Sequence, residues 1–338
     1  MNPAAPKGRG ARILIVTDAW HPAVNGVIRT IESLTRELEA MGHQVLVIGT
    51  DRFRTLPLPS YPEIRLAWNA WRMPAMIDAF APDAIHIATE GPLGMACRRY
   101  CLRRKRPFTT AFHTRFPEYV ASRLPVPLAW SYASLRRFHA PAAAVMVATP
   151  TLQGVLSARG FDHLRIWTRG VDTELFRPRD KSFLDAPRPI ALYVGRVAVE
   201  KNIEAFLELE LPGSKYVVGD GPQLASLKRR HPEVHFVGYQ HGEELARYYA
   251  AADVFVFPSR TDTFGLVLLE SLAAGVPVAA YPVAGPLDVI GASGVGCLQE
   301  DLGEATRAAL SISAESCRAY ALGFSWEASA RQFADIAV

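Results

Sequence analysis

The sequence predicts an α/β protein built from two doubly wound parallel sheets, and three observations predict it. Short apolar runs of strand length alternate with amphipathic stretches of helix length along most of the 338 residues. The alternation breaks once, at a Pro-rich and charged segment over residues 177–189, and then restarts. At roughly 100–200 residues per domain, this length predicts two domains, with a single large barrel as the main alternative. We therefore expect a Rossmann-like domain over residues 1–176 and another over residues 177–323.

The first half carries strand-like apolar runs separated by helical patterns. A helix is expected over residues 27–41, because Ile28, Ile31 and Leu38 recur on one face and Gly42 follows. A loop is expected from Arg52 through Tyr61. The expected strands are residues 12–17, 44–49, 84–88, 108–112 and 145–148.

The second half repeats the rhythm. Ligands of doubly wound sheets bind beyond the carboxyl ends of the strands, so two facing sheets predict an active site in the cleft between the domains. The expected strands are residues 190–194, 215–218, 234–237, 254–258 and 276–280, and the expected helices are residues 203–210, 243–251 and 265–274.

Composition excludes several classes of protein. Apolar residues make up 49% and charged residues 21%, which argues against a disordered chain. No apolar run reaches the roughly 18 residues of a membrane-spanning helix. The four cysteines match neither a zinc site nor a redox pair. No secretory apolar region follows the basic residues 1–12, so we expect a cytoplasmic protein.

The net charge of +4 conceals two halves of opposite sign. Residues 1–175 hold 22 Lys and Arg against 13 Asp and Glu, and residues 176–338 hold 15 against 20. A basic half is typical of proteins that meet nucleic acid, an anionic membrane or phosphorylated substrates. Arginines scattered in solvent give the same count, so charge alone leaves these alternatives open.

The strongest motif is Ser-Arg-Thr-Asp-Thr-Phe-Gly-Leu over residues 259–266, followed by Glu270. It comes directly after an expected strand and opens a helix, whose N-terminal amides and dipole suit a phosphate. Asp262 and Glu270 flank that point and can accept hydrogen bonds from hydroxyls of a sugar and a ribose. An N-cap aspartate and a solvated glutamate would give the same residues, so both interpretations stay open.

A second motif, Gly-Arg-x4-Lys, ends the first strand of the second half. Arg196 and Lys201 can both reach a diphosphate, and two fixed cations would stabilise a leaving nucleoside diphosphate without a metal. Asp-x-Asp is absent from the chain, which argues against a metal-chelating site for a nucleotide sugar. A surface salt bridge is the alternative.

Three weaker signals follow other strands. Asn25-Gly26-Val27 is a glycine turn at a helix N-terminus, and the segment 219–222 is a tight turn; each is equally consistent with a plain loop. His113 ends the expected strand 108–112, at the carboxyl edge of the first sheet. A histidine at that position is a candidate for the site or a structural residue.

Together these motifs, with residues 236–239 and 275–278, resemble the retaining GT-B glycosyltransferases of family 4, over nearly the whole chain. The resemblance implies two facing Rossmann-like domains, with the acceptor in the first and the nucleotide sugar in the second. It also implies that residues 324–338 form a helix that returns to the first domain. The first acid of the family's pair is usually Glu and is Asp262 here, which leaves the donor sugar open.

The resemblance implies a role for each matching residue. Arg196 and Lys201 bind the diphosphate, Glu270 holds the ribose hydroxyls, and Gly219 lies at the donor. The other implied donor contacts are Asp262 and the amides of Phe264, Gly265 and Leu266 for the sugar and its phosphate, Val237 and Gly238 for the base, Gly26 for the phosphates, and His113 for the sugar near the reacting carbon. His113, Asp262, Arg196 and Lys201 are the implied catalytic residues. Front-face attack, with the leaving phosphate as base, would retain the anomeric configuration without a metal or another cofactor.

The basic half would then take the acceptor. Basic residues beside exposed aromatic residues suit an anionic bilayer, at about 1 kcal/mol per Lys or Arg. Residues 113–119 and the Asp-containing motif are also similar to bacterial glycolipid synthases that act on diacylglycerol. We expect a peripheral enzyme on the inner face of the cytoplasmic membrane and no nucleic-acid partner. The expected membrane or acceptor residues are Trp68, Trp71, Arg98, Arg99, Arg103, Arg104, Lys105 and Arg106.

Several functions remain open. We expect transfer of a hexose or hexuronic acid from a UDP-linked donor to a lipid. The alternatives are a GDP-mannose-dependent mannosyltransferase, an enzyme acting on a soluble or polysaccharide acceptor, a nucleotide-sugar epimerase and a silent binding module. An epimerase needs acid and base groups in the first domain, where Asp18, Glu90 and Glu118 are the candidates.

Overall fold

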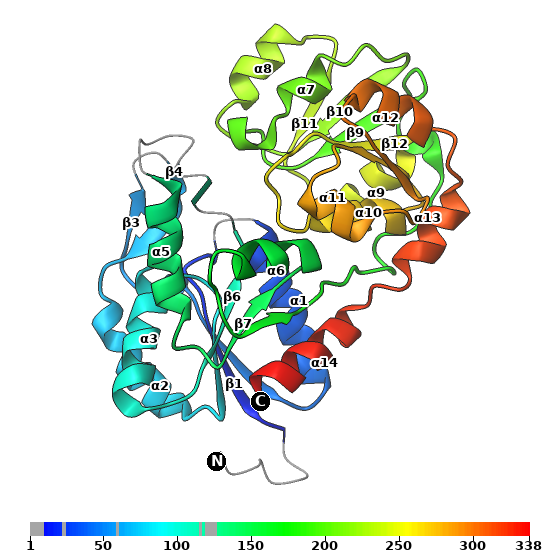
Figure 1. The fold of residues 1–338 in the computed structure, drawn as a ribbon. Helices are drawn as coiled ribbons and strands as arrows, with labels where there is room; N and C mark the ends of the chain where they lie inside the picture. Colours follow the sequence, from blue (N-terminus) through cyan, green and yellow to red (C-terminus); the bar gives the residue numbers. More distant parts are fainter. Residues whose placement is uncertain (1–9, 22–24, 59–60, 115–116, 119–126) are drawn as a thin grey trace. The chain divides into compact units, whose positions relative to one another are not determined.

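The computed structural model divides into two compact units, each with a six-stranded parallel sheet (Figure 1). The first unit is Met1–Arg169 together with Trp326–Val338, and the second is Gly170–Ser325. The two sheets confirm the fold class that the alternation of strands and helices predicts. The residues described are 10–21, 25–58, 61–114, 117–118 and 127–338.

The sheet of the first unit has the order β2-β1-β5-β6-β7-β8, and every neighbouring pair is parallel. β1 lies between β2 and β5, so the switch point of the sheet lies between the carboxyl ends of β1 and β5. The strands are β1 (Arg12–Val16), β2 (Gln44–Ile48), β5 (Ala84–Ile87), β6 (Thr109–Phe112), β7 (Ala144–Val147) and β8 (Leu164–Ile166).

Helices cover this sheet, and α1 (Gly26–Ala40) shows why they form where they do. Asn25 caps α1 by accepting hydrogen bonds from the amides of Val27 and Ile28. The apolar residues at helical spacing, Ile28 to Leu38, are buried as their periodicity predicts. Within the described residues, the other helices of the unit include η1 (Thr50–Arg52), η2 (Ala70–Arg72), α2 (Met73–Phe80), α3 (Pro92–Arg104), α5 (Leu128–His139), α6 (Pro150–Ser157) and α14 (Trp326–Ala337).

The prediction of a loop from Arg52 through Tyr61 is wrong. β3 (Thr55–Leu58) pairs antiparallel with β4 (Tyr61–Ala67) in a separate two-stranded sheet. Prolines at positions 57 and 62 argue against strands in the sequence. Both strands of a two-stranded ribbon are edge strands, and an edge strand tolerates a residue that cannot donate a backbone hydrogen bond.

The last helix, α14, returns to the first unit and packs against α1 (Figure 1). The indole N–H of Trp167 donates to Ser329 Oγ at 3.1 Å and to the Ser329 carbonyl at 3.2 Å. Phe333 is fully buried, with its ring centroid 5.1 Å from that of Trp167. The end of the chain is therefore part of the first unit's core.

The sheet of the second unit has the order β11-β10-β9-β12-β13-β14, again all parallel. Its switch point lies between the carboxyl ends of β9 and β12. The strands are β9 (Ile190–Val194), β10 (Ser214–Val218), β11 (His235–Gly238), β12 (Val254–Phe257), β13 (Val278–Ala280) and β14 (Gly296–Leu298). The helices are η3 (Lys181–Phe183), η4 (Val199–Lys201), α7 (Glu204–Leu207), α8 (Leu224–Arg230), α9 (Gly242–Ala251), α10 (Leu266–Ala273), α11 (Ala284–Val289), α12 (Leu302–Ala309) and α13 (Ala314–Ala321).

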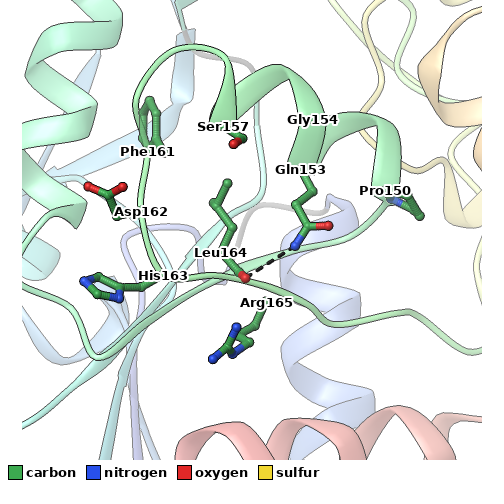
Figure 2. A pocket seen from close by; sticks show the side chains of 9 residues that line it. All are labelled: Pro150, Gln153, Gly154, Ser157, Phe161, Asp162, His163, Leu164 and Arg165. Atoms are coloured by element: carbon green, nitrogen blue, oxygen red, sulfur yellow. Dashed lines mark hydrogen bonds between the residues drawn. The ribbon is translucent and has the colours of Figure 1, made fainter.

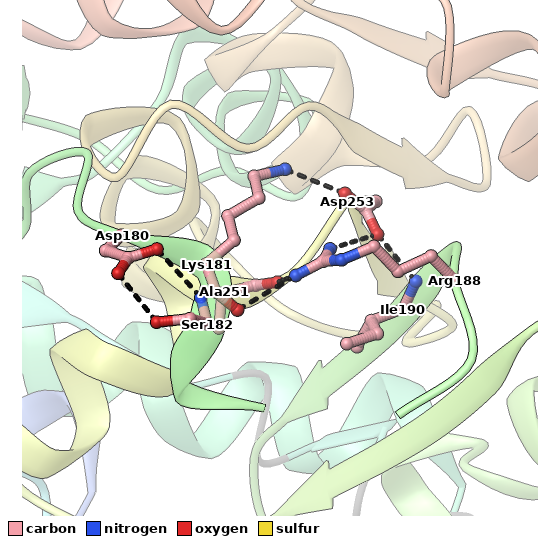
Figure 3. Close-up of polar contacts among 7 residues, drawn as sticks. All are labelled: Asp180, Lys181, Ser182, Arg188, Ile190, Ala251 and Asp253. Atoms are coloured by element: carbon pink, nitrogen blue, oxygen red, sulfur yellow. Dashed lines mark hydrogen bonds and ion pairs between the residues drawn. The ribbon is translucent and has the colours of Figure 1, made fainter. Parts of the chain in front are cut away.

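Asp253 fastens the two central strands of this sheet at their amino ends (Figure 3). Its carboxylate accepts from Lys181 Nζ at 2.7 Å, Arg188 Nη1 at 2.6 Å and the amide of Ile190 at 2.8 Å. Arg188 also donates to the carbonyl of Ala251. One carboxylate thus joins the start of β9 to the start of β12, whose opposite ends carry the strongest motifs.

The chain passes between the units at Arg169 and Gly170, seven residues before the boundary expected from composition. The segment that follows Gly170 packs in the second unit. The Phe176 ring lies 5.6 Å from that of Tyr249, and Arg318 donates to the carbonyls of Thr173 and Phe176. Contacts of buried side chains place residues 170–176 in the second unit. The Pro-rich segment from which the boundary was expected begins only after them, at residue 177.

We expect Phe333→Ala to lower the free energy of unfolding of the first unit by about 3–5 kcal/mol, because it leaves a cavity against Trp167. Asp335→Ala, an exposed change on the same helix, is the control. Urea unfolding followed by circular dichroism measures both. Equal midpoints for the two variants would contradict the packing of α14 described here.

Candidate active site

Two loops meet at the switch point of the second sheet, and side chains join them. The loop after β9 carries Lys201, and the loop after β12 carries Asp262. Lys201 Nζ lies 2.5 Å from Asp262 Oδ1, and each side chain is about one-fifth exposed. Asn202 Nδ2 donates to the Pro258 carbonyl, and Thr261 Oγ1 donates to the Glu200 carbonyl. The structure thus brings both strong motifs into one site.

Polar atoms at this junction lack partners within the described protein. Asp262 Oδ2 is buried and accepts no hydrogen bond, and the same holds for the hydroxyl of Ser259, which is 1% exposed. An unsatisfied buried polar group is costly, typically about 1–3 kcal/mol, so these atoms are suited to a polar ligand. Ser259 belongs to the motif, but its residue type alone gave no reason to single it out.

Arg196 also lies at this edge, directly after β9 and Gly195. Its guanidinium is 3.7 Å from Glu200 Oε1, and its side chain is 31% exposed. The hydroxyl of Tyr193 donates to the Arg196 carbonyl at 2.7 Å and fixes the backbone of the turn. Both cations of the motif therefore lie on one loop, held by acidic neighbours at a solvent-accessible edge.

The N-terminus of α10 follows Asp262. The helix begins at Leu266, and Gly265 precedes it in the left-handed region with φ of 85°. No side chain caps the helix, and the amides of Phe264, Gly265 and Leu266 donate to no described acceptor. This end of α10 therefore presents free donors and the positive end of the helix dipole, as the motif predicts.

Glu270 lies in the second turn of α10 and is 6% exposed. Its Oε2 accepts from the hydroxyl of Tyr249 at 3.0 Å, and Tyr249 is fully buried in α9. The solvated glutamate considered from the sequence is therefore wrong. Tyr249 orients this carboxylate, a role that the sequence did not reveal, since nothing in a buried helical tyrosine identifies its partner.

Two glycines also lie at the carboxyl end of this sheet, Gly219 directly after β10 and Gly238 at the end of β11. A Cβ on Gly219 would lie 1.9 Å from the Gly195 carbonyl oxygen, so the turns after β9 and β10 touch through backbone alone. The Gly238 carbonyl accepts from the Gly219 amide, and the Val237 carbonyl accepts from Gln240. Each of these carbonyls keeps a second lone pair, which backbone recognition of a base would need.

The first unit carries the two remaining implied donor residues. His113 directly follows β6, and its Nδ1 lies 3.3 Å from Arg169 Nη2. Burial, then the charge of Arg169 and then that of His86, holds the pKa of His113 well below its ordinary value. Gly26 is the exposed first residue of α1, and the cap by Asn25 occupies the next two amides.

The carboxylates that an epimerase would need have structural partners. Asp18 accepts from the amides of Leu93 and Gly94 and from the hydroxyl of Thr89, so it caps α3. Burial raises the pKa of Asp18, against these hydrogen bonds. Glu90 lies 3.2 Å from buried His139, and Glu118 accepts from Tyr132. Asp18 and Glu90 thus have structural partners in the first unit, whereas Glu118 Oε2 is buried without a hydrogen-bond partner among the described residues.

The structure removes Arg98 and Arg106 from the expected membrane surface. Arg98 donates to the carbonyls of Phe138 and Arg137 at the end of α5, and Arg106 donates to that of Pro82. Orphan carbonyls at a helix end attract such donors, and a count of basic residues cannot show which arginines they take. The exposed members of the set are Arg99, Arg103, Arg104 and Lys105.

Apolar side chains are exposed beside these cations. Met95 and Leu102 are 47% and 44% exposed, on the same face of α3 as Arg99. Trp71, which is 68% exposed, lies on η2, an element that packs against α3, and Trp68 lies edge to face with it. Trp130, at the start of α5, is 73% exposed and was not singled out in the sequence.

A hollow of about 600 Å³ lies along α6 and β8 in the first unit (Figure 2). Gln153 donates to the Leu164 carbonyl across it, and the side chains of His163 and Arg165 lie at its border. None of its lining residues belongs to a motif.

No helix in the described part of the chain is long and apolar enough to cross a membrane. Within the same residues, no group of His, Cys, Asp and Glu is placed to hold a metal ion.

Comparison with known proteins agrees with this fold. Residues 24–175 match Glycosyltransferase Family 4, and residues 188–314 match Glycosyl transferases group 1. A GDP-mannose-dependent alpha-mannosyltransferase of Mycobacterium tuberculosis is 30% identical over 83% of this chain and 82% of its own. An alpha-monoglucosyldiacylglycerol synthase of Streptococcus pneumoniae is 28% identical over 80% and 71%. The structure of a sucrose-phosphate synthase from Thermosynechococcus elongatus superposes with a TM-score of 0.76 at 23% identity, covering 96% of this chain and 98% of that one.

The fold and the site define a glycosyltransferase of the GT-B type. The chain belongs to glycosyltransferase family 4, with a Glycosyl transferases group 1 region in its second unit. The resemblance given by the motifs is confirmed at this level.

We expect Gly219→Ala to destabilise the second unit more than Gly238→Ala does. Both positions have positive φ, where an added Cβ costs about 1–2 kcal/mol. Only the Cβ at Gly219 also meets a backbone oxygen, whereas nothing lies within 4 Å of one at Gly238. Thermal unfolding of the two variants measures the difference, and equal losses would contradict the close approach of the two turns.

Proposed function

We propose that this chain transfers a hexose or hexuronic acid from a UDP-linked donor to a membrane lipid such as diacylglycerol, with retention of anomeric configuration. The observation that carries the proposal is the Lys201–Asp262 pair beside Arg196 and the uncapped end of α10. Fixed cations, free amides and carboxylates suit a sugar diphosphate, since they meet its charged and hydroxyl groups separately.

In this proposal the diphosphate meets Lys201 and Arg196, and the amides of residues 264–266 bind a phosphate oxygen. Asp262 keeps Lys201 paired through Oδ1 and accepts a sugar hydroxyl through Oδ2, the oxygen that lacks a partner. Glu270 accepts from the ribose, oriented by Tyr249. His113 contacts the donor sugar, Gly26 the phosphates, and Val237 and Gly238 the base.

The chemistry follows from this charge distribution. The acceptor hydroxyl attacks the anomeric carbon as the bond to the diphosphate breaks, and the leaving phosphate oxygen takes the hydroxyl proton. Attack from the leaving-group side retains the configuration. Lys201 and Arg196 stabilise the charge that develops on the diphosphate, so we propose that the reaction needs neither a metal nor another cofactor.

The exposed face of the first unit supports a lipid acceptor. Exposed cations of α3 share the helix with exposed Met95 and Leu102, and exposed Trp71 lies on η2, which packs against α3; such a combination suits an anionic bilayer surface. One relative is named an alpha-monoglucosyldiacylglycerol synthase. We propose peripheral binding at the inner face of the cytoplasmic membrane.

A second candidate is transfer of mannose from GDP-mannose. It is favoured by the relative named a GDP-mannose-dependent alpha-mannosyltransferase. In both candidates Val237 and Gly238 contact the base through their backbone, so no side chain in the sequence identifies the base as uracil or guanine. Thermal shifts with UDP, GDP and their sugar conjugates decide between the candidates: stabilisation by guanosine compounds alone would replace the first proposal with the second.

We expect Lys201→Ala to lower kcat by at least about 100-fold, because it removes a cation from the developing charge of the leaving group. Lys228→Ala, an exposed change on α8, is the matched control and should leave the rate unchanged. Turnover of radiolabelled nucleotide sugar on lipid vesicles measures both. A Lys201→Ala enzyme with the rate of the control would refute the assigned site.

We expect replacement of Arg103, Arg104 and Lys105 together by Ala to weaken binding to vesicles containing phosphatidylglycerol. The loss corresponds to about 1 kcal/mol per cation. Lys228, Arg229 and Arg230, replaced together, remove the same charge from the second unit and serve as the control. Flotation measures the binding of each variant to the vesicles. Equal loss of binding in both triple variants, or no binding by the parent protein, would refute the proposal that this face of the first unit binds the membrane.

A further inference from the structure

A guanidinium is buried among the aromatic side chains that surround His113. Arg169 is 4% exposed, and its guanidinium carbon lies 3.9 Å from the ring centroid of Trp167. The same indole contacts the rings of His113 and His86 edge to face, with both centroids 5.9 Å away. The cation therefore lies in the layer that supports the implied catalytic histidine.

The contacts of Arg169 leave it without a counter-ion. Its Nη1 donates to the carbonyls of Trp167 at 2.6 Å and Thr168 at 3.2 Å. Among the residues that the structure describes, no carboxylate forms an ion pair with it. Burying a guanidinium unpaired is expensive, and burial lowers the pKa of Arg169 to about 9. An arginine buried at this cost indicates a specific use.

The remaining contact of Arg169 identifies that use. Its Nη2 lies 3.3 Å from Nδ1 of His113. A guanidinium can only donate, so Nδ1 must accept, and the ring proton of neutral His113 must reside on Nε2. Protonation of Nδ1 would place two donors and two positive charges against one another. The contact therefore selects one tautomer and disfavours the imidazolium.

We propose that Arg169 is a positioning residue, which holds His113 neutral with its proton on Nε2 so that this N–H can donate to an oxygen of the transferred sugar. The inference rests on the proposed function of His113. Trp167 holds the arrangement from the other side, since its indole N–H is fixed by Ser329 and its ring faces both side chains.

The charges around His113 agree in sign. The titratable groups that face it are Arg169, which follows β8, and His86 on β5. Burial and then Arg169 lower the pKa of His86 to about 3, so His86 stays neutral at physiological pH. Burial and then the charge of Arg169 oppose a proton on His113. Loss of the arginine charge must therefore raise the pKa of His113 toward its ordinary value near 6.5.

Nitrogen NMR of ¹⁵N-histidine-labelled full-length protein tests the tautomer directly, with His113→Asn assigning the signal. We expect Nδ1 of His113 to be unprotonated, and Nε2 protonated, from pH 5.5 to 8. A proton on Nδ1 in this range would overturn the proposal. The measurement needs no substrate, so failure of the protein to transfer any sugar would refute the proposed function without affecting this result.

Substitutions test the consequence for catalysis. We expect Arg169→Leu to lower kcat/KM by about 100-fold, the scale of a lost transition-state donor. Activity should also fall more steeply toward acidic pH than in the parent, because loss of the Arg169 charge raises the pKa of His113. Arg169→Lys, which keeps a buried donor and charge, should restore the flat pH profile in part. Arg165→Leu, an exposed change on β8, should behave as the parent.

A structural role alone would give a different pattern. In that case Arg169→Leu would lose the same fraction of activity at every pH, in proportion to its loss of thermal stability, and the tautomer of His113 would not change in the folded fraction. That pattern would overturn the proposal. If Arg169→Leu does not fold, the tautomer of the parent and the pH profile of Arg169→Lys still decide.

Discussion

Parallel pairing is the constraint on which the rest of this structure depends. Because the strands of each sheet run in one direction, every loop that follows a strand emerges at the same edge. In the second unit this rule brings Lys201 after β9 to within 2.5 Å of Asp262 after β12, although 61 positions separate them in the chain. Asp253 fastens the opposite ends of β9 and β12, so the site is built on strands fixed at both ends.

Charge is used differently in the two units. In the second, the cations Lys201 and Arg196 face acidic partners, Asp262 and Glu200, so their charges are locally balanced. In the first, Arg169 is buried with no carboxylate paired to it among the described residues, and its Nη2 lies 3.3 Å from Nδ1 of His113. The excess of basic residues counted in the first half thus combines exposed cations with arginines whose hydrogen bonds hold elements together.

The sequence predicted what depends on periodicity and on the direction of strands. Both sheets, the joining of the two strong motifs, and the position of His113 after β6 follow from these. It failed where a long-range partner decides the outcome. Arg98 binds the end of α5, and Glu270 meets Tyr249; nothing local distinguishes these side chains from solvated ones. Asn202 differs from these residues. It adopts the left-handed region, which Asn tolerates better than most residues, so an Asn directly after Lys201 is a local signal for the turn.

The aspartate that stands in place of the family's usual glutamate is closely surrounded in the structure. Asp262 already contacts Lys201 through one oxygen, and its second oxygen is buried beside the start of α10. A side chain longer by one methylene would have to give up one of these positions unless the loop moved. The backbone around it has little freedom, because a Cβ on Gly285 would approach the carbonyl oxygens of Asp262 and Phe264 at 3.2 and 3.0 Å. The spacing of the two loops, set by the two central strands, thus accommodates the shorter acid here.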